Sequence, residues 1–345
     1  MTTYIRSTGN ISPQHSLDTD VFFQMQVKTS TNFFKSLEPE YDKFVDSKMI
    51  RRMSRIVKMG VAAAMTCLQN AGVDQPAAIL TATAYGCLED TSAFLRKMIE
   101  FEEKMLSPTA FIQSTHNTVG AQIALMLKCH NYNNTIVHRS FSFENALTES
   151  MLLLQENTGP VLVGAIDEIT DDRHAILSRF GLYKQSHKDS KTITGNIAGE
   201  GAAFFLLDRE PGNRPLAVLK DVQIKYNPGN TDSLELAILE FLIENDCSID
   251  QVDLVLTAHT GNAYQDVTDD ALLKSVFLNN PCYPYKMLCG DYPTASGFAF
   301  WLAVLLLKEK RLPEWMTGLK LPLQHILIHH HSGKAHHSFF LISSC

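Results

Sequence analysis

Apolar and polar residues follow one another along the chain in blocks whose lengths and periods predict strands and helices in turn. Strands are expected where short apolar runs end in turns: residues 4–9, 78–83, 135–137, 161–165, 202–207, 216–226, 252–258, 285–288, 325–330 and 338–343. Helices are expected where apolar residues recur every three or four positions: residues 48–71, 92–104, 117–129, 233–245, 270–277 and 294–308. This alternation indicates an α/β fold with mostly parallel sheets.

The order of strands and helices restarts after a break in the middle of the chain. The sequence PGNRP at 211–215 is the sharpest local break, and a polar turn surrounds Pro228. We therefore expect two similar halves, with residues 1–228 forming the N-terminal half and residues 229–345 the C-terminal half.

Composition narrows the class of protein. The 345 residues are 45% hydrophobic and carry a formal net charge of -7 without long blocks of one sign, which argues against a nucleic-acid or acidic-lipid surface. The start of the chain does not resemble a signal peptide, and the longest apolar run, 297–307, is too short to cross a bilayer. The 7 cysteines form no CxxC pair. We expect a cytoplasmic protein with reduced cysteines and no membrane span.

The segment NTIVHRSFSFENALTE, residues 134–149, carries the main candidate for chemistry. Its first residues are strand-like, the pattern breaks around Ser140, and an apolar helical pattern follows. The free amide groups at such a strand-to-helix elbow can hold a nucleophile or stabilise an oxyanion. Ser140 is the side chain that this elbow presents.

Several motifs, in their order, resemble the β-ketoacyl-acyl carrier protein synthases. They are YIRSTGNISP at 4–13, RRMSRIVKMGVAAAMTCLQNAGV at 51–73, SPTAFIQSTHNTVGAQIALMLK at 107–128, VLVGAIDE at 161–168, GEGAAFFLL at 199–207, TAHTGNAYQD at 257–266 and YKMLCGDYPTASG at 285–297. The resemblance covers nearly the whole chain. It implies a thiolase-like layered αβαβα fold built from two similar halves.

The same resemblance implies that the family's catalytic residues have largely changed. The nucleophilic cysteine is replaced by Ser140, the first histidine is kept as His259, and the second falls on Asp291. Lys286 matches the family lysine, but its usual acidic partner falls on Phe300. An alcohol needs a general base to attack a thioester, and a carboxylate opposes the enolate that decarboxylation forms. Ordinary condensation is therefore not expected.

One hypothesis is a non-catalytic or weakly catalytic subunit of the chain length factor type, as in aryl polyene or flexirubin pathways. The resemblance then implies a heterodimer with a complete ketosynthase paralogue through the N-terminal halves, or a homodimer in isolation. It also implies an acyl chain on the phosphopantetheine arm of acyl carrier protein, with no cofactor bound by the chain itself. Bulky residues would limit chain length, or else simply pack in the core; the candidates are Phe111, Ile112, Met126, Phe141 and Phe143.

A second hypothesis is a Ser-His-Asp triad of Ser140, His259 and Asp291, which would hydrolyse or transfer acyl groups from thioesters. It requires Ser140 Oγ within hydrogen-bond reach of one His259 nitrogen and Asp291 within reach of the other. If these hydrogen bonds do not form, Ser140 is a small residue that fills the space of the family's cysteine.

Histidines and cysteines offer further candidates. The C-terminal run HHHSGKAHHS contains His329, His330, His331, His336 and His337. Neighbouring residues on a strand point to opposite faces, so His329 and His331 could share a metal ion while His330 could not. We expect instead that these histidines border the former active site, and that Cys87 and Cys289 are small apolar residues and not nucleophiles.

Overall fold

The computed structural model describes residues 2–28, 33–104, 106–157, 159–184, 195–262 and 266–345. Its strands are β1 Thr3–Ile11, β2 Ala78–Ala82, β3 Tyr132–Ile136, β4 Val161–Asp167, β5 Gly201–Asp208, β6 Ala217–Tyr226, β7 Leu254–Thr257, β8 Cys282–Pro284, β9 His325–Ser332 and β10 His336–Ser343. Its helices are α1 Thr19–Gln24, α2 Ser47–Ile50, α3 Arg55–Ala71, α4 Leu88–Glu100, α5 Pro108–Gln113, α6 Thr118–Leu127, α7 Ser142–Gln155, α8 Asp171–Arg179, α9 Thr231–Glu244, α10 Val267–Leu272, α11 Lys286–Cys289 and α12 Ser296–Glu309.

The strands form one hydrogen-bonded sheet in the order β3-β2-β4-β5-β1-β6-β10-β9-β7-β8. The two halves of this order are mirror copies. Counted from the centre outwards, β1, β5, β4, β2 and β3 of the first half correspond to β6, β10, β9, β7 and β8 of the second. Pairing also repeats: β2 is parallel to β3 and β4, and β7 is parallel to β8 and β9. The central neighbours are antiparallel, including β1 with β6. The expected α/β fold of two similar halves is confirmed. The expectation of mostly parallel pairing is wrong: among the described strands, β1–β5, β1–β6, β6–β10, β9–β10 and β4–β5 are antiparallel and outnumber the parallel pairs, because β1, β5, β6 and β10 form an antiparallel centre.

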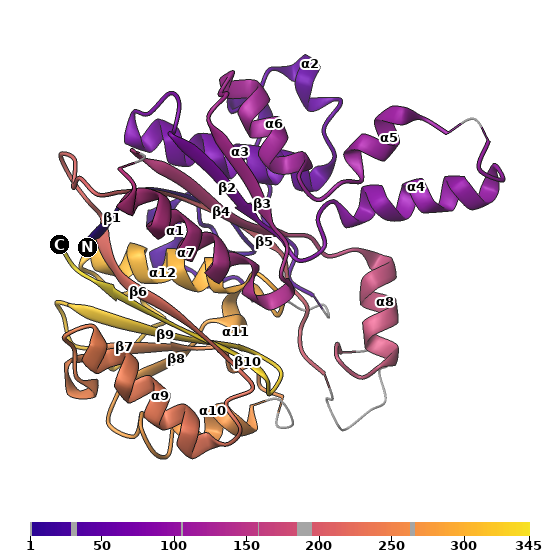
Figure 1. The fold of residues 1–345 in the computed structure, drawn as a ribbon. Helices are drawn as coiled ribbons and strands as arrows, with labels where there is room; N and C mark the ends of the chain where they lie inside the picture. The colour runs from indigo at the N-terminus through magenta and orange to yellow at the C-terminus, as the bar shows by residue number, and fades with distance from the viewer. Residues whose placement is uncertain (1, 29–32, 105, 158, 185–194, 263–265) are drawn as a thin grey trace.

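Helices cover both faces of each half of the sheet, so that the molecule is layered (Figure 1). The outer helix α3 packs on the N-terminal strands, α7 and α12 lie between the two halves, and α9 and α10 cover the C-terminal strands. Three large clusters of buried apolar residues fill the spaces between these layers. The expected layers are therefore present.

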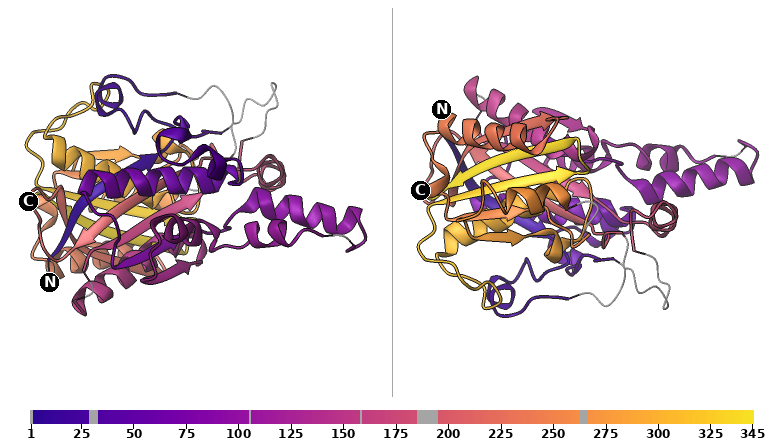
Figure 2. Two further views of the ribbon diagram at one scale, coloured as in Figure 1. Left: turned by 90° about the horizontal axis from the view of Figure 1, so that it is seen from above. Right: turned by 90° about the horizontal axis from the view of Figure 1, so that it is seen from below.

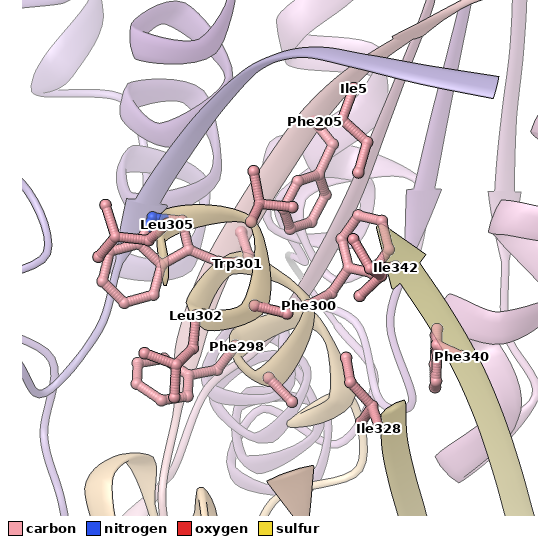
Figure 3. Close-up of a cluster of buried hydrophobic side chains, with 14 of the residues drawn as sticks. Ile5, Phe205, Phe298, Phe300, Trp301, Leu302, Leu305, Ile328, Phe340 and Ile342 are labelled. Carbon is pink, nitrogen blue, oxygen red and sulfur yellow. The ribbon is translucent and has the colours of Figure 1, made fainter. Parts of the chain in front are cut away.

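Helix α12 occupies the centre because its sequence is apolar on every side, a pattern typical of a buried helix. Each residue from Ser296 to Leu307 is buried. Figure 3 shows Phe300 and Trp301 of this helix among side chains from strands of both halves. The rings of Phe205 and Phe300 meet edge to face with centroids 4.7 Å apart. This core fixes the strand ends from which the candidate site residues project.

Two sequence predictions for single elements are wrong. The helix expected over 48–71 is broken between α2 and α3, because Ser54 adopts an extended N-cap conformation. The strand expected over 285–288 is the short helix α11, and the strand beside it, β8, ends at Pro284. A short apolar run fits either element, and Pro284 cannot donate to a longer ladder.

Three further features complete the fold. The apolar pattern predicts no helix at residues 171–179, where the structure contains α8. Within the described ranges, no helix combines the length and apolarity that a bilayer span requires. For the division near Pro228, strand order favours a boundary within residues 209–216, since β6 takes the place in the second half that β1 has in the first. We propose this earlier boundary.

Candidate active site

The elbow between β3 and α7 carries Ser140, as the sequence predicts. Ser140 lies in a 3-10 turn, Arg139–Phe141, and is buried. Arg139 has a φ of 50°, a left-handed conformation that is costly for a residue with a side chain and that occurs at active-site elbows. The neighbouring Ser142 braces the turn, because its hydroxyl accepts from His138 N at 2.8 Å and donates to Thr83 O at 2.9 Å.

His259 follows β7 and faces two carboxylates from its own segment. Its Nδ1 lies 3.3 Å from Asp266 Oδ2, and its Nε2 lies 3.2 Å from Asp270 Oδ1. Asp266 is buried and also accepts from Thr260 N at 2.9 Å. Both imidazole nitrogens are therefore close to acidic groups of the same loop and helix.

Asp291 forms an ion pair with Lys286, and the two residues meet across the turn after α11. Lys286 Nζ donates to Asp291 Oδ1 at 2.8 Å and to the carbonyl of His331 at 3.0 Å. Asn196 Nδ2 donates to Asp291 Oδ2 at 2.7 Å. Burial alone would raise the pKa of Asp291, but Lys286 and Asn196 hold it below its ordinary value. The carboxylate is thus ionised near neutral pH.

These contacts separate the four predicted site residues. Lys286 and Asp291 come together, whereas no hydrogen bond between described residues joins Ser140 to His259 or His259 to Asp291. The connection that the triad hypothesis requires is absent from this set of contacts. Asp291, which would be the acid of the triad, is instead paired with Lys286.

The C-terminal histidines are buried on β9 and β10. Asp269 Oδ1 lies 3.2 Å from His329 Nδ1, and Asp269 Oδ2 lies 3.2 Å from His331 Nε2. His329 Nε2 lies 3.1 Å from His337 Nδ1. His330 points to the other face, where its Nδ1 contacts the hydroxyl of Tyr285. The alternation predicted from strand geometry is therefore confirmed.

These histidines form a buried polar cluster and not an evident metal centre. Burial lowers the pKa of His329 and His330, and it lowers the pKa of His337 to about 3. Among the residues with described positions, no group of three or more histidine, cysteine, aspartate or glutamate side chains is placed to hold a metal ion. The metal hypothesis has no donor set there. The backbone contact of Lys286 with His331 does bring the cluster beside the candidate site.

The two cysteines weighed as alternative nucleophiles are both buried. Burial raises the thiol pKa of Cys87 and of Cys289 well above the ordinary value, so neither is a thiolate near neutral pH. The proposed chain-length residues occupy different environments. Phe143 packs in the central core, its ring centroid 5.8 Å from that of Phe300, whereas Phe111 and Ile112 are exposed on α5. Met126 is partly buried against the α3 core, and Phe141 packs on His336.

A pocket of about 310 Å³ opens beside Asp291. Its lining residues come from the loop after β2, from the α8 region, from the loop after α11 and from the β9–β10 turn; they are Tyr85, Arg173, Leu177, Leu182, Tyr183, Asp291, Tyr292, Pro293, Ser332 and Gly333. The sequence pattern gives no signal for Arg173 or Asn196, because each reaches the site from a distant segment. Asp266 and Asp270 could have been found, since they lie one helical turn apart soon after His259.

Comparison with known proteins relates the N-terminal part of the chain to a family domain. Residues 26–180 match the model described as the beta-ketoacyl synthase, N-terminal domain. This stretch of the chain is similar to the ketosynthase N-terminal domain. No curated protein sequence matches it.

Solved ketosynthase structures share the fold of the whole chain. The ishigamide ketosynthase/chain length factor has a TM-score of 0.80 at 16% identity, covering 100% of this chain and 99% of its own. A ketosynthase in complex with its chain length factor from Xenorhabdus doucetiae has a TM-score of 0.75 at 14% identity, covering 100% and 98%. A type II polyketide synthase acyl-carrier protein in complex with its ketosynthase gives 0.79 at 12%, covering 100% and 99%. The expected thiolase-like fold is confirmed.

Proposed function

We propose that this chain is a non-catalytic or weakly catalytic ketosynthase-like subunit of the chain length factor type. It pairs with a complete ketosynthase and helps to extend acyl or polyketide chains that are held on carrier protein. The observation that carries the proposal is the state of the site: Ser140 stands at the elbow without a base hydrogen-bonded to it in the described part of the chain. Asp291, which the resemblance assigns to the family's second histidine position, is ionised and paired with Lys286.

The chemistry of these groups disfavours condensation by this subunit alone. A serine hydroxyl attacks a thioester only when a general base lies within hydrogen-bond reach of its proton. The His259 nitrogens face Asp266 and Asp270 instead. The negative charge on Asp291 would also repel the enolate that malonyl decarboxylation produces. Acyl transfer or thioester hydrolysis at Ser140 is the alternative, and no contact described above favours it.

The N-terminal half presents an exposed apolar surface that fits a protein partner. Helices α4 and α5 form an arm that projects from the layered body (Figure 2). Exposed apolar side chains lie on this arm, on α6 and along β3, which is an edge strand; they are Leu95, Ile99, Phe101, Phe111, Ile112, Leu125, Tyr132 and Val137. We call this set the arm-edge surface. Soluble proteins seldom leave so many large apolar side chains in water, so the surface supports a dimer.

A complete ketosynthase paralogue is the partner that we propose for the arm-edge surface, with a second copy of this chain as its substitute in isolation. The structural neighbours include a ketosynthase bound to its chain length factor and one bound to its carrier protein. By analogy, the acyl chain would arrive on the phosphopantetheine arm of a carrier protein, and the chain would need no cofactor of its own. A pigment pathway of the aryl polyene or flexirubin type is the proposed setting.

Co-expression with neighbouring ketosynthase genes tests the proposal. We expect one complex by size-exclusion chromatography, products by mass spectrometry only from that complex, and unchanged product yield after Ser140→Ala. The matched control replaces the partner's nucleophilic cysteine, which should abolish product. The proposal is wrong if the isolated chain becomes acylated by malonyl or acyl carrier protein and Ser140→Ala abolishes that acylation.

A further inference from the structure

Arg173 places a cation between two adjoining pockets on the same side of the molecule as Asp291. It lines the pocket of about 310 Å³ described above and a second pocket of about 240 Å³, which also includes Tyr85 and Leu177. Arg173 lies in the first turn of α8, where its backbone N–H donates to Thr170 Oγ1 at 3.2 Å. The helix therefore fixes the base of this side chain, and its guanidinium is the positive group at the junction of the two pockets.

The guanidinium is held by aromatic rings and not by a carboxylate. Its central carbon lies 4.5 Å from the ring centroid of Tyr85 and 5.9 Å from that of Tyr183. Within the described ranges, no acidic oxygen lies within ion-pair distance of it, and its Nη1 is buried without a hydrogen-bond partner. Rings on a guanidinium face leave its edge, with its forked N–H donors, free to bind an oxyanion.

The nearest acidic groups already have other partners. Asp291 is engaged by Lys286 at 2.8 Å and by Asn196 at 2.7 Å. Asp167 accepts from Thr83 Oγ1 at 2.9 Å and from Thr294 Oγ1 at 2.9 Å. Neither carboxylate is within ion-pair distance of Arg173, so the guanidinium keeps a buried donor without an acceptor among the described residues. A buried donor without an acceptor is costly, and a bound ligand can remove that cost.

We propose that Arg173 binds the oxyanion of a ligand in this pocket. The proposal rests on the proposed function for the choice of ligand: either the phosphate of a phosphopantetheine arm or the carboxylate of a malonyl-type acyl group carries the required anion. Both present two oxygens in the spacing that a guanidinium fork matches, and Tyr85 and Tyr183 would flank the site.

Two matched ligand pairs test the proposal and distinguish the sources. Isothermal titration calorimetry on the full chain compares phosphopantetheine with pantetheine, and malonyl-pantetheine with acetyl-pantetheine. We expect the anionic member of one pair to bind about tenfold more tightly, as for a charge-assisted bidentate contact. A preference in the first pair assigns the phosphate, and a preference in the second assigns the carboxylate. Equal affinities within both pairs overturn the proposal.

Variants of α8 assign the preference to one side chain. Arg173→Gln should remove the tenfold preference, and Arg173→Lys should keep part of it, because lysine retains the charge without the fork. Arg179→Gln, an exposed arginine on the same helix, should retain the whole preference. Thermal unfolding of each variant shows that it is folded. A preference that survives Arg173→Gln in a folded protein overturns the assignment. Because these titrations need no partner synthase, their outcome is independent of whether the chain forms the proposed heterodimer.

Discussion

Glu200 and Arg55 form a two-point ion pair between the start of β5 and the start of α3. Arg55 Nη1 donates to Glu200 Oε2 at 2.7 Å, and Arg55 Nη2 contacts Oε1. Glu200 is fully buried and also accepts from the backbone N–H groups of Ser36 and Ile169, at 2.8 Å and 3.0 Å. One carboxylate therefore joins four segments: the β5 start, α3, the loop before α2 and the loop after β4.

Replacement of Glu200 by Gln should destabilise the protein strongly. The change leaves a partly buried guanidinium without its counter-charge, and the expected loss of unfolding free energy is about 3 kcal/mol. Urea denaturation monitored by circular dichroism measures it. Glu38→Gln is the control, because Glu38 contacts the same Arg55 from a more exposed position and its loss should cost less than about 1 kcal/mol. Equal effects of the two changes would contradict the central role of Glu200.

Asp291→Asn should lower stability near neutral pH and remove an acid-dependent part of it. The carboxylate is partly exposed, so we expect a loss of about 2 kcal/mol, less than for a fully buried pair. The pKa of Asp291 is lower in the folded protein than its ordinary value. Its contribution is therefore complete above the unfolded-state pKa of about 4 and is lost as the pH falls through the folded-state value.

Urea titrations of the wild type and of Asp291→Asn at several pH values measure this contribution. The difference between them should shrink on acidification below about pH 4. Glu102→Gln, which removes an exposed partner of Lys104, serves as the control and should have little effect at any pH. A difference between wild type and Asp291→Asn that is constant with pH would show that the carboxylate charge does not stabilise the fold.

The sequence predicts those parts of the fold that depend on local pattern. The apolar run of α12, the continuous strand β4 and the elbow at Ser140 each follow from residues within one segment. Helix α8 could not be predicted in this way, since its sequence DDRHAILSR is polar. Its half-buried Arg173 packs on Tyr183, which follows the helix, and on Tyr85 from a distant loop. Tertiary contacts override a weak local pattern there.

The same distinction between local pattern and tertiary contact applies to the candidate site. The residue identities at Ser140, His259, Lys286 and Asp291 could be obtained from motif order, but their partners could not. Gly199 illustrates the reason. A Cβ at this position would lie 2.0 Å from the carbonyl oxygen of Cys289, so the loop before β5 can pack on the turn after α11 only if residue 199 is glycine. That close approach brings the Asn196 segment to Asp291, where Gly199 N donates to Asp291 O at 3.1 Å. A single sequence contains no record of such pairs.

The buried histidines should make the protein sensitive to acid. The pKa of His337 is lowered to about 3 by burial, so the unfolded chain takes up a proton more readily than the folded one. Stability from the neutral imidazole is complete above the unfolded-state pKa of about 6.5 and declines as the pH falls toward the folded-state value. The decline approaches about 1.4 kcal/mol per pH unit for one proton.

His337→Gln should flatten this dependence, because the amide cannot take up a proton. The groups around His337 are His329, His331 and Asp269, and they remain in the variant. The slope of unfolding free energy against pH between about 6.5 and 4 is the quantity to compare, since the packing change alters the level but not the slope. His130→Gln, at an exposed position, should keep the wild-type slope. An unchanged slope in His337→Gln would assign the acid sensitivity to other groups.

The arm-edge surface should be the site of subunit association, and a charge placed there should prevent it. Ile99 on α4 is 82% exposed, and burying it against a partner would favour the complex. Ile99→Glu would place a carboxylate in that apolar contact, where its desolvation is not compensated, and should weaken co-purification with the ketosynthase at least about tenfold. Ile243→Glu on α9 is the matched control, since Ile243 is 72% exposed but lies on the C-terminal half, outside the arm-edge surface.

If both changes weaken the complex equally, the contact is not specific to the arm. If Ile243→Glu alone disrupts it, the subunits associate through the C-terminal halves. Loss of the complex only with Ile99→Glu, at unchanged thermal stability, would show that the projecting helices bind the partner.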